Sequence, residues 1–238
     1  MNYQNVETFD KFHEAWSKQL QGLLRHLRSA QKNFRSAAGE SSEAVAEEEL
    51  HGAVKRVMVH CSDYYSARRS VTEADVASMV ASPWSSQLER ALQWVGGWRP
   101  TAAFHLVYTE SDVHFESRIV GDRIGDLSDL SPLQLRRVSV LQCKTVKEEN
   151  DITEEASDWQ DNASLLVPGT VDNLDDHILG LSDIVQMADN LRLATITGVV
   201  AMLNPFQAAE FLTAAAKLLT GVHCWGMIRD DPEIFPAF

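Results

Sequence analysis

The residues that could hold a metal ion are eight histidines, three cysteines and many carboxylates. Helical bundles that bind two irons use a Glu-x-x-His pair on each of two helices, with two further glutamates. This sequence contains one such pair, Glu48 and His51, so we expect no di-iron site. His223 and Cys224 are adjacent, and either residue type can ligate haem iron. The alternative is a structural role, in which the two residues form a partly buried pair that closes the last helix.

Acid–base catalysis is the second chemistry that the residue types suggest. Adjacent carboxylates occur at Glu148-Glu149, Glu154-Glu155 and Asp175-Asp176. Neighbouring side chains on a helix diverge by about 100°, so each pair is typical of a solvated helix face. The sequence contains none of the motifs G-x-S-x-G, G-x-x-x-x-G-K-S/T, G-x-G-x-x-G or H-E-x-x-H. We therefore expect a protein that is not an enzyme and that needs no cofactor.

The N-terminal segment combines a stripe of bulky apolar residues with basic residues. The apolar positions include Trp16 and Leu20, and the interleaved basic positions are Arg25, Arg28, Lys32 and Arg35. A basic amphipathic helix with bulky anchors can enter a calmodulin-type groove or lie on an acidic surface. The alternative is that the apolar stripe packs against the other helices of this protein. Both interpretations apply if the helix can leave the bundle and bind a partner with the same face. Trp16, Arg25 and Arg28 are the candidates for partner binding on this helix.

Residues 94–100 have the sequence W-V-G-G-W-R-P. This stretch could be a loop that binds a ligand or a corner between two helices. Gly96 and Gly97 predict the end of a helix, with Gly97 or its neighbour at a positive φ. Pro100 is expected in the first turn of the next helix, where its missing N–H is harmless.

The flanking side chains of this stretch have separate expected roles. Trp94 and Trp98 are expected to pack the corner into the protein. Arg99 is a further candidate for partner binding, and its alternative is an ion pair with an acid of residues 148–155.

The elements that must position these residues are helices, because the apolar spacing is helical almost throughout and no hairpin signal occurs. Ser131-Pro132 with Gln134, and Asn204-Pro205 with Gln207, predict two capped helix starts. The expected helices cover about 9–34, 43–65, 72–80, 83–95, 100–119, 131–159, 175–203 and 204–221, with a loop at 121–130 and a polar linker at 160–174. The predicted fold is all-α, a single domain over 1–238 built as a bundle of long helices with short connecting helices. Residues 227–238 are expected to form a loose tail.

The overall charge bears on the classes of partner. The chain has 238 residues and a formal net charge of −13. Nucleic-acid binders normally present a basic surface, so we expect no direct DNA binding by this chain alone. No stretch has the length of an apolar membrane span, and the N-terminus lacks a signal-peptide pattern. Three widely spaced cysteines suit a reducing compartment, so the nucleus and the cytoplasm are the expected locations.

Several motifs in a fixed order resemble one plant family. They are F-D-K-F-H-E-A-W at 9–16, W-V-G-G-W-R-P-T-A-A-F-H-L-V-Y at 94–108, L-S-P-L-Q-L-R-R-V-S-V-L-Q at 130–142, T-V-K-E-E-N-D-I-T-E-E at 145–155, L-R-L-A-T-I at 191–196 and P-F-Q-A-A-E-F-L at 205–212. Together they resemble the seed-dormancy-control domain of the delay-of-germination family, in its delay-of-germination-like, transcription-factor-like branch. A related domain forms the C-terminal part of TGA-type basic leucine zipper transcription factors.

The resemblance implies a helical, non-enzymatic regulator of seed maturation, dormancy and abscisic-acid responses that binds other proteins. The implied partners are type 2C protein phosphatases, transcription regulators and calmodulin, and a homodimer is a further expectation. Two alternatives stay open: a sensor that binds haem or a fatty-acyl chain, and sequence-specific DNA binding together with a zipper partner. The basic region of the zipper relatives has no counterpart before Phe9. Residues 227–238 contain no histidine, so no haem ligand is carried over from the family, and His223 is a candidate on its own merits.

Overall fold

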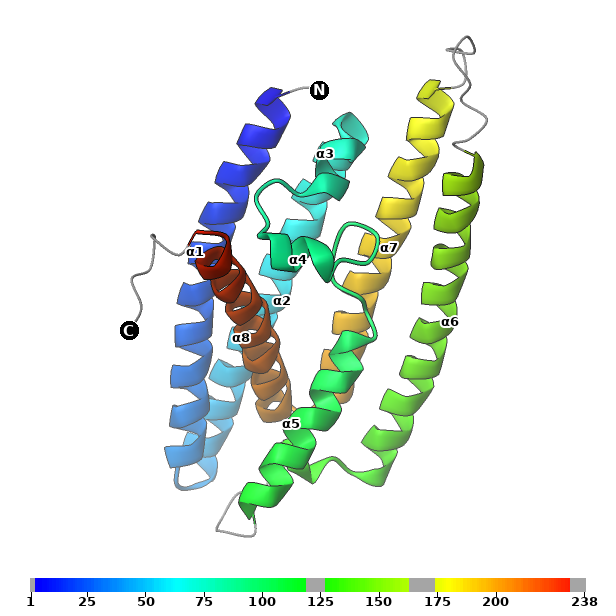
Figure 1. Cartoon of the computed structure of the whole chain (residues 1–238). Coiled ribbons are helices and arrows are strands. Elements are labelled where there is room, and N and C mark those ends of the chain that lie inside the picture. Colours follow the sequence, from blue (N-terminus) through cyan, green and yellow to red (C-terminus); the bar gives the residue numbers. More distant parts are fainter. Residues whose placement is uncertain (1–2, 119–126, 163–173, 232–238) are drawn as a thin grey trace.

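The computed structural model describes residues 3–118, 127–162 and 174–231, and these residues form an all-α fold (Figure 1). The described part contains eight α-helices, and its single β-bridge joins Trp94 and Gly97. The helices and one 3-10 helix (η1) are α1 (Tyr3–Ser36), α2 (Glu40–Ala74), α3 (Val76–Ala81), α4 (Gln87–Ala91), α5 (Ala102–Arg118), η1 (Leu127–Asp129), α6 (Pro132–Asn162), α7 (Leu174–Met202) and α8 (Pro205–Asp230). The predicted fold class, a bundle of long helices with short connecting helices, is confirmed.

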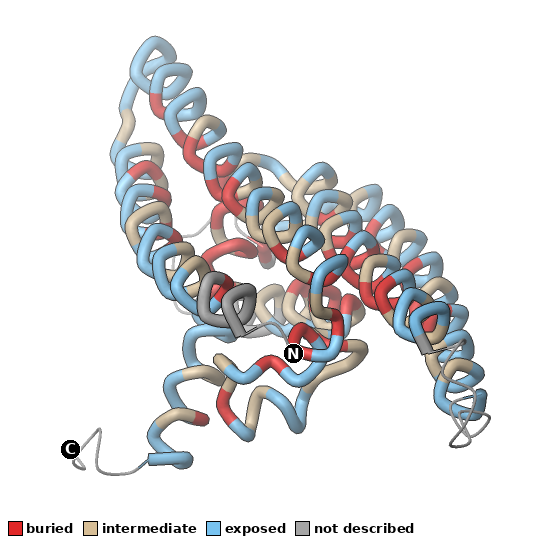
Figure 2. The backbone as a smooth tube through the Cα atoms, turned by 90° about the horizontal axis from the view of Figure 1, so that it is seen from above, coloured by how far each residue is buried: buried red, intermediate tan, exposed pale blue. Residues whose placement is uncertain are grey.

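Two long antiparallel pairs make the frame of the bundle. Helices α1 and α2 form one pair, and α6 and α7 form the other (Figure 1). Helices α5 and α8 cross in front of this frame, and the short helix α3 lies near one end of it. Seen from above, the buried positions face the space between the helices (Figure 2).

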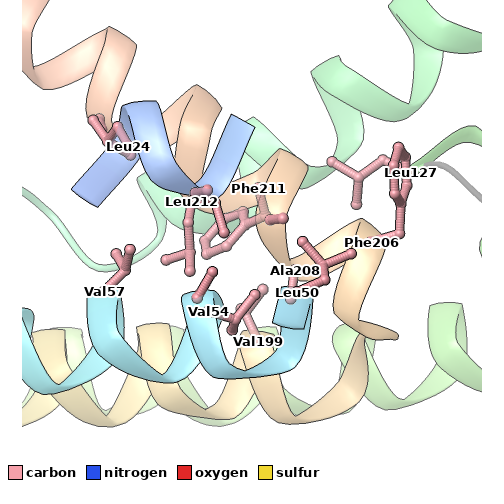
Figure 3. Close-up of a cluster of buried hydrophobic side chains, with 14 of the residues drawn as sticks. Leu24, Leu50, Val54, Val57, Leu127, Val199, Phe206, Ala208, Phe211 and Leu212 are labelled. Carbon is pink, nitrogen blue, oxygen red and sulfur yellow. The ribbon is translucent and has the colours of Figure 1, made fainter. Parts of the chain in front are cut away.

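The main core forms around the first half of α8. Phe206, Phe211 and Leu212 belong to one buried cluster with Leu50 of α2 and Leu24 of α1 (Figure 3). This half of α8 is apolar on nearly every side, as expected for a helix enclosed by others. By length and composition α8 would pass for a membrane span, but its first half is enclosed by the other helices of the bundle.

A second, smaller cluster lies between α6 and α7. It consists of the buried residues Ile152, Ile184, Ala188 and Leu191. The side chains of Trp94 and Trp159 pack against it. The segment 94–98 therefore lies beside this cluster.

Both predicted helix starts have the expected capping box. Gln134 N donates to Ser131 Oγ at 3.2 Å, and Ser131 N donates back to Gln134 Oε1 at 2.9 Å. Gln207 N donates to Asn204 Oδ1 at 2.8 Å, with the reciprocal bond at 3.1 Å. These side chains satisfy backbone N–H groups that have no partner within the helix.

Some predicted helix limits are wrong. The helix expected over 83–95 is short, because Ser86 and Glu89 form a capping box that starts α4 at Gln87 and the helix ends at Ala91. Residues 72–74 of the helix expected over 72–80 belong to α2, since Asp75 separates α2 from α3.

The last helix also differs from the prediction. It passes through Gly221 and ends at Asp230, because one glycine inside a helix costs only about 1 kcal/mol. Residues 227–230 of the expected tail are helical, whereas 232–238 lie outside the described residues. Most of the expected loop and linker, at 121–126 and 163–173, also lies outside them.

Candidate functional site

The segment W-V-G-G-W at 94–98 forms a two-residue turn. Trp94 N donates to Gly97 O at 2.7 Å, and Gly97 N donates to Trp94 O at 3.2 Å. Between them Val95 has φ 44° and Gly96 has φ 66°. Consecutive positive φ angles are typical of a tight hairpin turn. The positive φ expected at Gly97 or its neighbour is therefore at Gly96. Gly96 and Gly97 do not end a helix, because α4 ends at Ala91.

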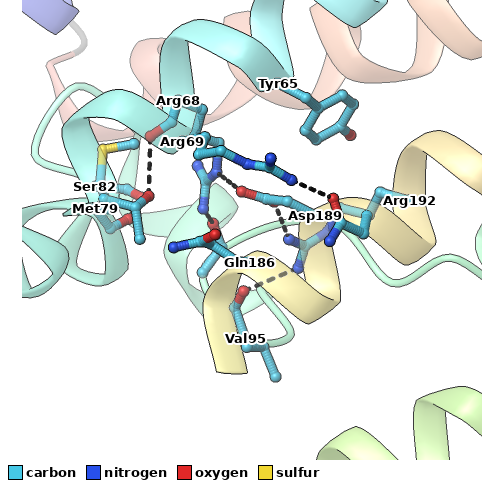
Figure 4. A network of polar contacts seen from close by, with 12 residues as sticks. Tyr65, Arg68, Arg69, Met79, Ser82, Val95, Gln186, Asp189 and Arg192 are labelled. Carbon is cyan, nitrogen blue, oxygen red and sulfur yellow. Dashed lines mark hydrogen bonds and ion pairs between the residues drawn. The ribbon is translucent and has the colours of Figure 1, made fainter. Parts of the chain in front are cut away.

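Val95 is a β-branched residue in a left-handed conformation, which other contacts must stabilise. Its carbonyl accepts a hydrogen bond from Arg192 Nη2 of α7 at 2.9 Å. The same guanidinium donates to Trp94 O through Nη2 and to Trp98 O through Nε at 2.7 Å. Arg192 is 1% exposed and holds the turn by its backbone carbonyls (Figure 4).

A second buried arginine reaches the turn from α2. Arg68 Nη2 donates to Gly96 O at 2.6 Å, and Arg68 Nε donates to Asp189 Oδ2 at 2.6 Å. Asp189 also accepts from Arg192 Nη1 at 2.5 Å, so one carboxylate joins both guanidinium groups (Figure 4). The carbonyl groups of the turn accept hydrogen bonds from further N–H groups of the two arginines. A buried charge is costly unless it is paired and hydrogen-bonded in this way.

The electrostatics of this cluster follow from burial and from Asp189. Burial lowers the pKa of Arg192, and the attraction of Asp189 opposes that shift. Burial also disfavours the charge of Arg68, but Tyr64 and Asp189 outweigh it and raise the pKa of Arg68. Both side chains carry their positive charge, since arginine does not deprotonate in proteins.

The two tryptophans of the turn point to different helices. Trp94 Nε1 donates to Thr153 Oγ1 of α6 at 3.0 Å, and its ring lies against Arg192. Trp98 Nε1 donates to Tyr65 Oη of α2 at 2.9 Å. Burial raises the pKa of Tyr65. The turn thus joins α2, α6 and α7, and the expectation that both tryptophans pack into the protein agrees with their contacts.

Arg99 forms the ion pair that was one of its two expected alternatives. Its Nε lies 2.9 Å from Glu149 Oε2, and Glu149 is 1% exposed. Thr101 N donates to the other oxygen of Glu149 at 2.6 Å. The start of α5 is therefore tied to α6. Pro100 lies two residues before the first residue of α5 and not in its first turn, which corrects the prediction.

Trp16 faces α2. Its ring stacks on His60 at 4.8 Å between centroids, and its Nε1 donates to His60 O at 2.9 Å. His60 Nε2 hydrogen-bonds the carbonyl of Trp16 at 2.9 Å. Arg25 and Arg28, the other candidates on α1, are exposed. As partner-binding residues all three remain a prediction.

His223 joins the end of α8 to α4. Its Nδ1 lies 3.0 Å from Glu89 Oε2, and this hydrogen bond raises the pKa of His223. Glu89 is also the residue that caps α4 with Ser86. The geometry gives His223 a structural contact, while Cys224 beside it is exposed. In the described ranges no group of three His, Cys, Asp or Glu side chains could hold a metal ion.

Arg68, Asp189 and Arg192 were not among the site residues predicted from the sequence. A signal was present, because Asp189 and Arg192 interrupt the apolar stripe of α7 at a spacing of three residues. Charged residues on a core-facing stripe are almost never buried without partners. The network has the chemistry of a closed structural junction: its described carboxylate, guanidinium and carbonyl groups bind one another.

The sequence of this chain is similar to a known protein family and to several plant proteins. Residues 23–109 match the family model DOG1, described as seed dormancy control. The Arabidopsis thaliana protein DOG1-like 4 is 28% identical over 94% of this chain and 94% of its own length. Protein RESPONSE TO ABA AND SALT 1 of the same plant is 23% identical, over 91% of this chain and 94% of its own length. Transcription factor TGA6, also from A. thaliana, is 24% identical over 87% of this chain and 59% of its own length.

The resemblance predicted from the motifs is confirmed by these matches. They support the DOG1-like family, with a weaker similarity to TGA transcription factors. The relatives are regulatory proteins, which supports a regulatory role for this chain in seed dormancy.

Proposed function

With the DOG1-like family as the premise, we propose that this protein is a non-enzymatic regulator that acts through protein–protein contacts in seed maturation, dormancy and abscisic-acid response. The observation that best supports the proposal is the similarity to DOG1-like 4, because it extends over 94% of both chains. The name of RESPONSE TO ABA AND SALT 1 supports the abscisic-acid part.

The proposed partners are type 2C protein phosphatases, transcription regulators and calmodulin. The similarity to TGA6 supports contacts with the transcription machinery and a nuclear location, with the cytoplasm as the second location. A net charge of −13 opposes approach to the DNA backbone, so we propose DNA contact only together with a zipper partner.

The experiment is an affinity purification from extract of developing seeds, with the folded chain as bait. We expect phosphatases or transcription regulators to be enriched over an acidic helical protein of unrelated sequence. Recovery of neither class would contradict the proposal. A gel-shift titration with the chain alone should give no shift, whereas a shift that weakens steeply with salt would favour direct DNA binding.

A further inference from the structure

We propose that a groove over α8, together with the exposed end of that helix, binds an acidic amphipathic helix of a partner protein. This inference rests on the proposed function, because it specifies where a protein partner binds and what its surface is like. Three observations support it: a concave site with a basic rim, an apolar helix face that continues out of the site, and the contrast with the charge of the whole chain.

The groove has a volume of about 570 Å³ and lies between α1 and α5, with α8 as its floor. Phe206, Ala214 and Leu218 of α8 supply apolar lining, and Leu106 of α5 adds to it. The hydroxyl oxygen of Thr213, which also lines the groove, is buried and has no hydrogen-bond partner within the described part of the chain. A concave apolar site with a few polar groups is typical of a binding site.

The rim of the groove is basic although the chain is acidic. Arg28, Lys32 and Arg35 of α1 and Lys217 of α8 line it, against two carboxylates, those of Glu110 and Glu210.

Arg35 is held in place at the rim. Its Nη2 lies 3.4 Å from Glu210 Oε1, and its guanidinium lies over the Phe206 ring at 4.6 Å. Arg28 and Lys32 are exposed on the same stripe of α1 as Arg25. In a chain of net charge −13, this concentration of cations favours an anionic occupant.

The apolar face of α8 continues beyond the groove. From Leu218 the same face passes through Gly221, Trp225 and Ile228 in steps of three and four residues. Leu218 is 50% exposed, Trp225 is 70% exposed and Ile228 is 40% exposed. Exposed tryptophans are over-represented among the residues that contribute most binding energy at protein interfaces.

The length of this surface suits a helix. The positions from Glu210 to Ile228 span about 27 Å at 1.5 Å per residue, which matches a partner helix of about 18 residues. Its apolar face would cover Leu218 and Trp225, and its acidic residues would lie beside Arg28 and Lys32. Both contacts together define the partner as acidic and amphipathic.

The test uses a fluorescently labelled synthetic helical peptide of about 20 residues, with leucine on one face and glutamate elsewhere. Fluorescence anisotropy with the full chain should show binding that weakens with salt. A peptide with lysine in place of every glutamate should bind at least about tenfold more weakly. The double variant Arg28→Glu with Lys32→Glu, and separately Trp225→Ala, should each weaken binding of the acidic peptide by about tenfold or more.

Matched controls lie on α6. Arg136→Glu with Arg137→Glu makes the same charge change at exposed positions, and Val140→Ala trims a side chain that is 64% exposed. Both should change the affinity by less than about twofold. Circular dichroism melting curves confirm that every variant is folded.

Four results would overturn the proposal. They are no binding of the acidic peptide, equal weakening by the α6 controls, binding to phosphatidylserine vesicles without binding to the peptide, and a dimer that Trp225→Ala converts to a monomer without peptide binding. The seed-extract purification separates this inference from the proposed function. If the Arg28→Glu, Lys32→Glu variant still recovers the regulators, the proposed function stands and the groove is not their binding site.

Discussion

Gly97 is the glycine of the 94–98 turn at which the structure leaves little room for a side chain. A Cβ atom there would lie 2.8 Å from Arg192 Cζ and 3.0 Å from Arg192 Nε. Arg192 is buried and hydrogen-bonded to the turn and to Asp189, so its guanidinium has no space to move. We expect Gly97→Ala to lower the free energy of unfolding by about 2 kcal/mol, measured by urea denaturation.

The matched control for this variant is Gly221→Ala. Gly221 lies inside α8, and a Cβ there would meet no atom within 4 Å. Because alanine favours a helix over glycine, this change should raise the free energy of unfolding by about 0.5–1 kcal/mol. An unchanged unfolding midpoint for Gly97→Ala would show that the contact with Arg192 is not tight.

His223 and Glu89 give a second prediction at the residue scale. The hydrogen bond to Glu89 raises the pKa of His223, so its stabilisation is complete below about pH 6.5 and is lost as pH rises through the raised pKa. Burial alone would raise the pKa of Glu89, but hydrogen bonds from His223 and Ser86 outweigh it and lower that pKa. The contribution of Glu89 is therefore present above about pH 4.5 and is lost as pH falls through its lowered pKa.

The measurement compares the wild-type chain with His223→Gln at pH 5.5 and at pH 8 by urea denaturation. At the lower pH, the free energy of unfolding of the wild-type chain should exceed that of His223→Gln by about 0.5 kcal/mol. The difference is small because His223 is partly exposed and solvent screens the pair. It should disappear at the higher pH. His13, whose pKa burial lowers, is present in both proteins, so its own titration largely cancels in the difference. A difference in free energy of unfolding that grows with pH would contradict the ion pair between His223 and Glu89.

At this scale the sequence predicted the roles of some residues and missed others for a physical reason. For Arg99 the sequence left two alternatives open, a partner contact and an ion pair with an acid of 148–155, and the structure contains the ion pair. The left-handed conformation of Val95 could not be predicted, because it depends on Arg192, which lies about a hundred positions away in the sequence.

The tie between α2 and α7 is the main feature at the scale of elements. Asp189 of α7 holds Arg68 of α2 and Arg192 of its own helix. Replacing Asp189 with Asn leaves two buried guanidinium groups without a counter-charge, so the free energy of unfolding should fall by about 3 kcal/mol or more. Asp183→Asn, on the same helix but exposed, should change it by less than about 0.5 kcal/mol. Equal effects in urea denaturation would contradict a special role for the network.

The two helix starts with a capping signal were easier to predict than the end of α8. Ser131 with Gln134, and Asn204 with Gln207, are local signals, and both form the expected bonds. The end of α8 depends on contacts far along the chain, since Gln87 N donates to Asp230 Oδ2 at 2.7 Å. A glycine such as Gly221 ends a helix only where no such contact favours its continuation.

For the whole molecule, apolar periodicity was enough to predict an all-α bundle, because every long helix has a stripe that must be buried. It could not place the binding surface. The stripe of α1 packs inside the protein through residues such as Leu24 and Leu27, whereas the exposed apolar face belongs to the end of α8. Both helices carry apolar residues at helical spacing, and the packing decides which of those residues are buried.

The two cores differ in size, which predicts different local stabilities. The main core joins all the long helices, including α6 through Val138 near its start, whereas the second has four buried residues between α6 and α7, among them Ile152 and Ile184. Regions with less buried apolar surface open at lower free energy. In native-state hydrogen exchange, amides of residues 150–160 and 178–186 should therefore exchange together, before those of 206–216. Replacing Trp159, whose ring stacks on His177 at 4.4 Å, with alanine should speed that exchange and leave 206–216 unchanged. Equal acceleration in both regions would mean that the molecule unfolds as one unit.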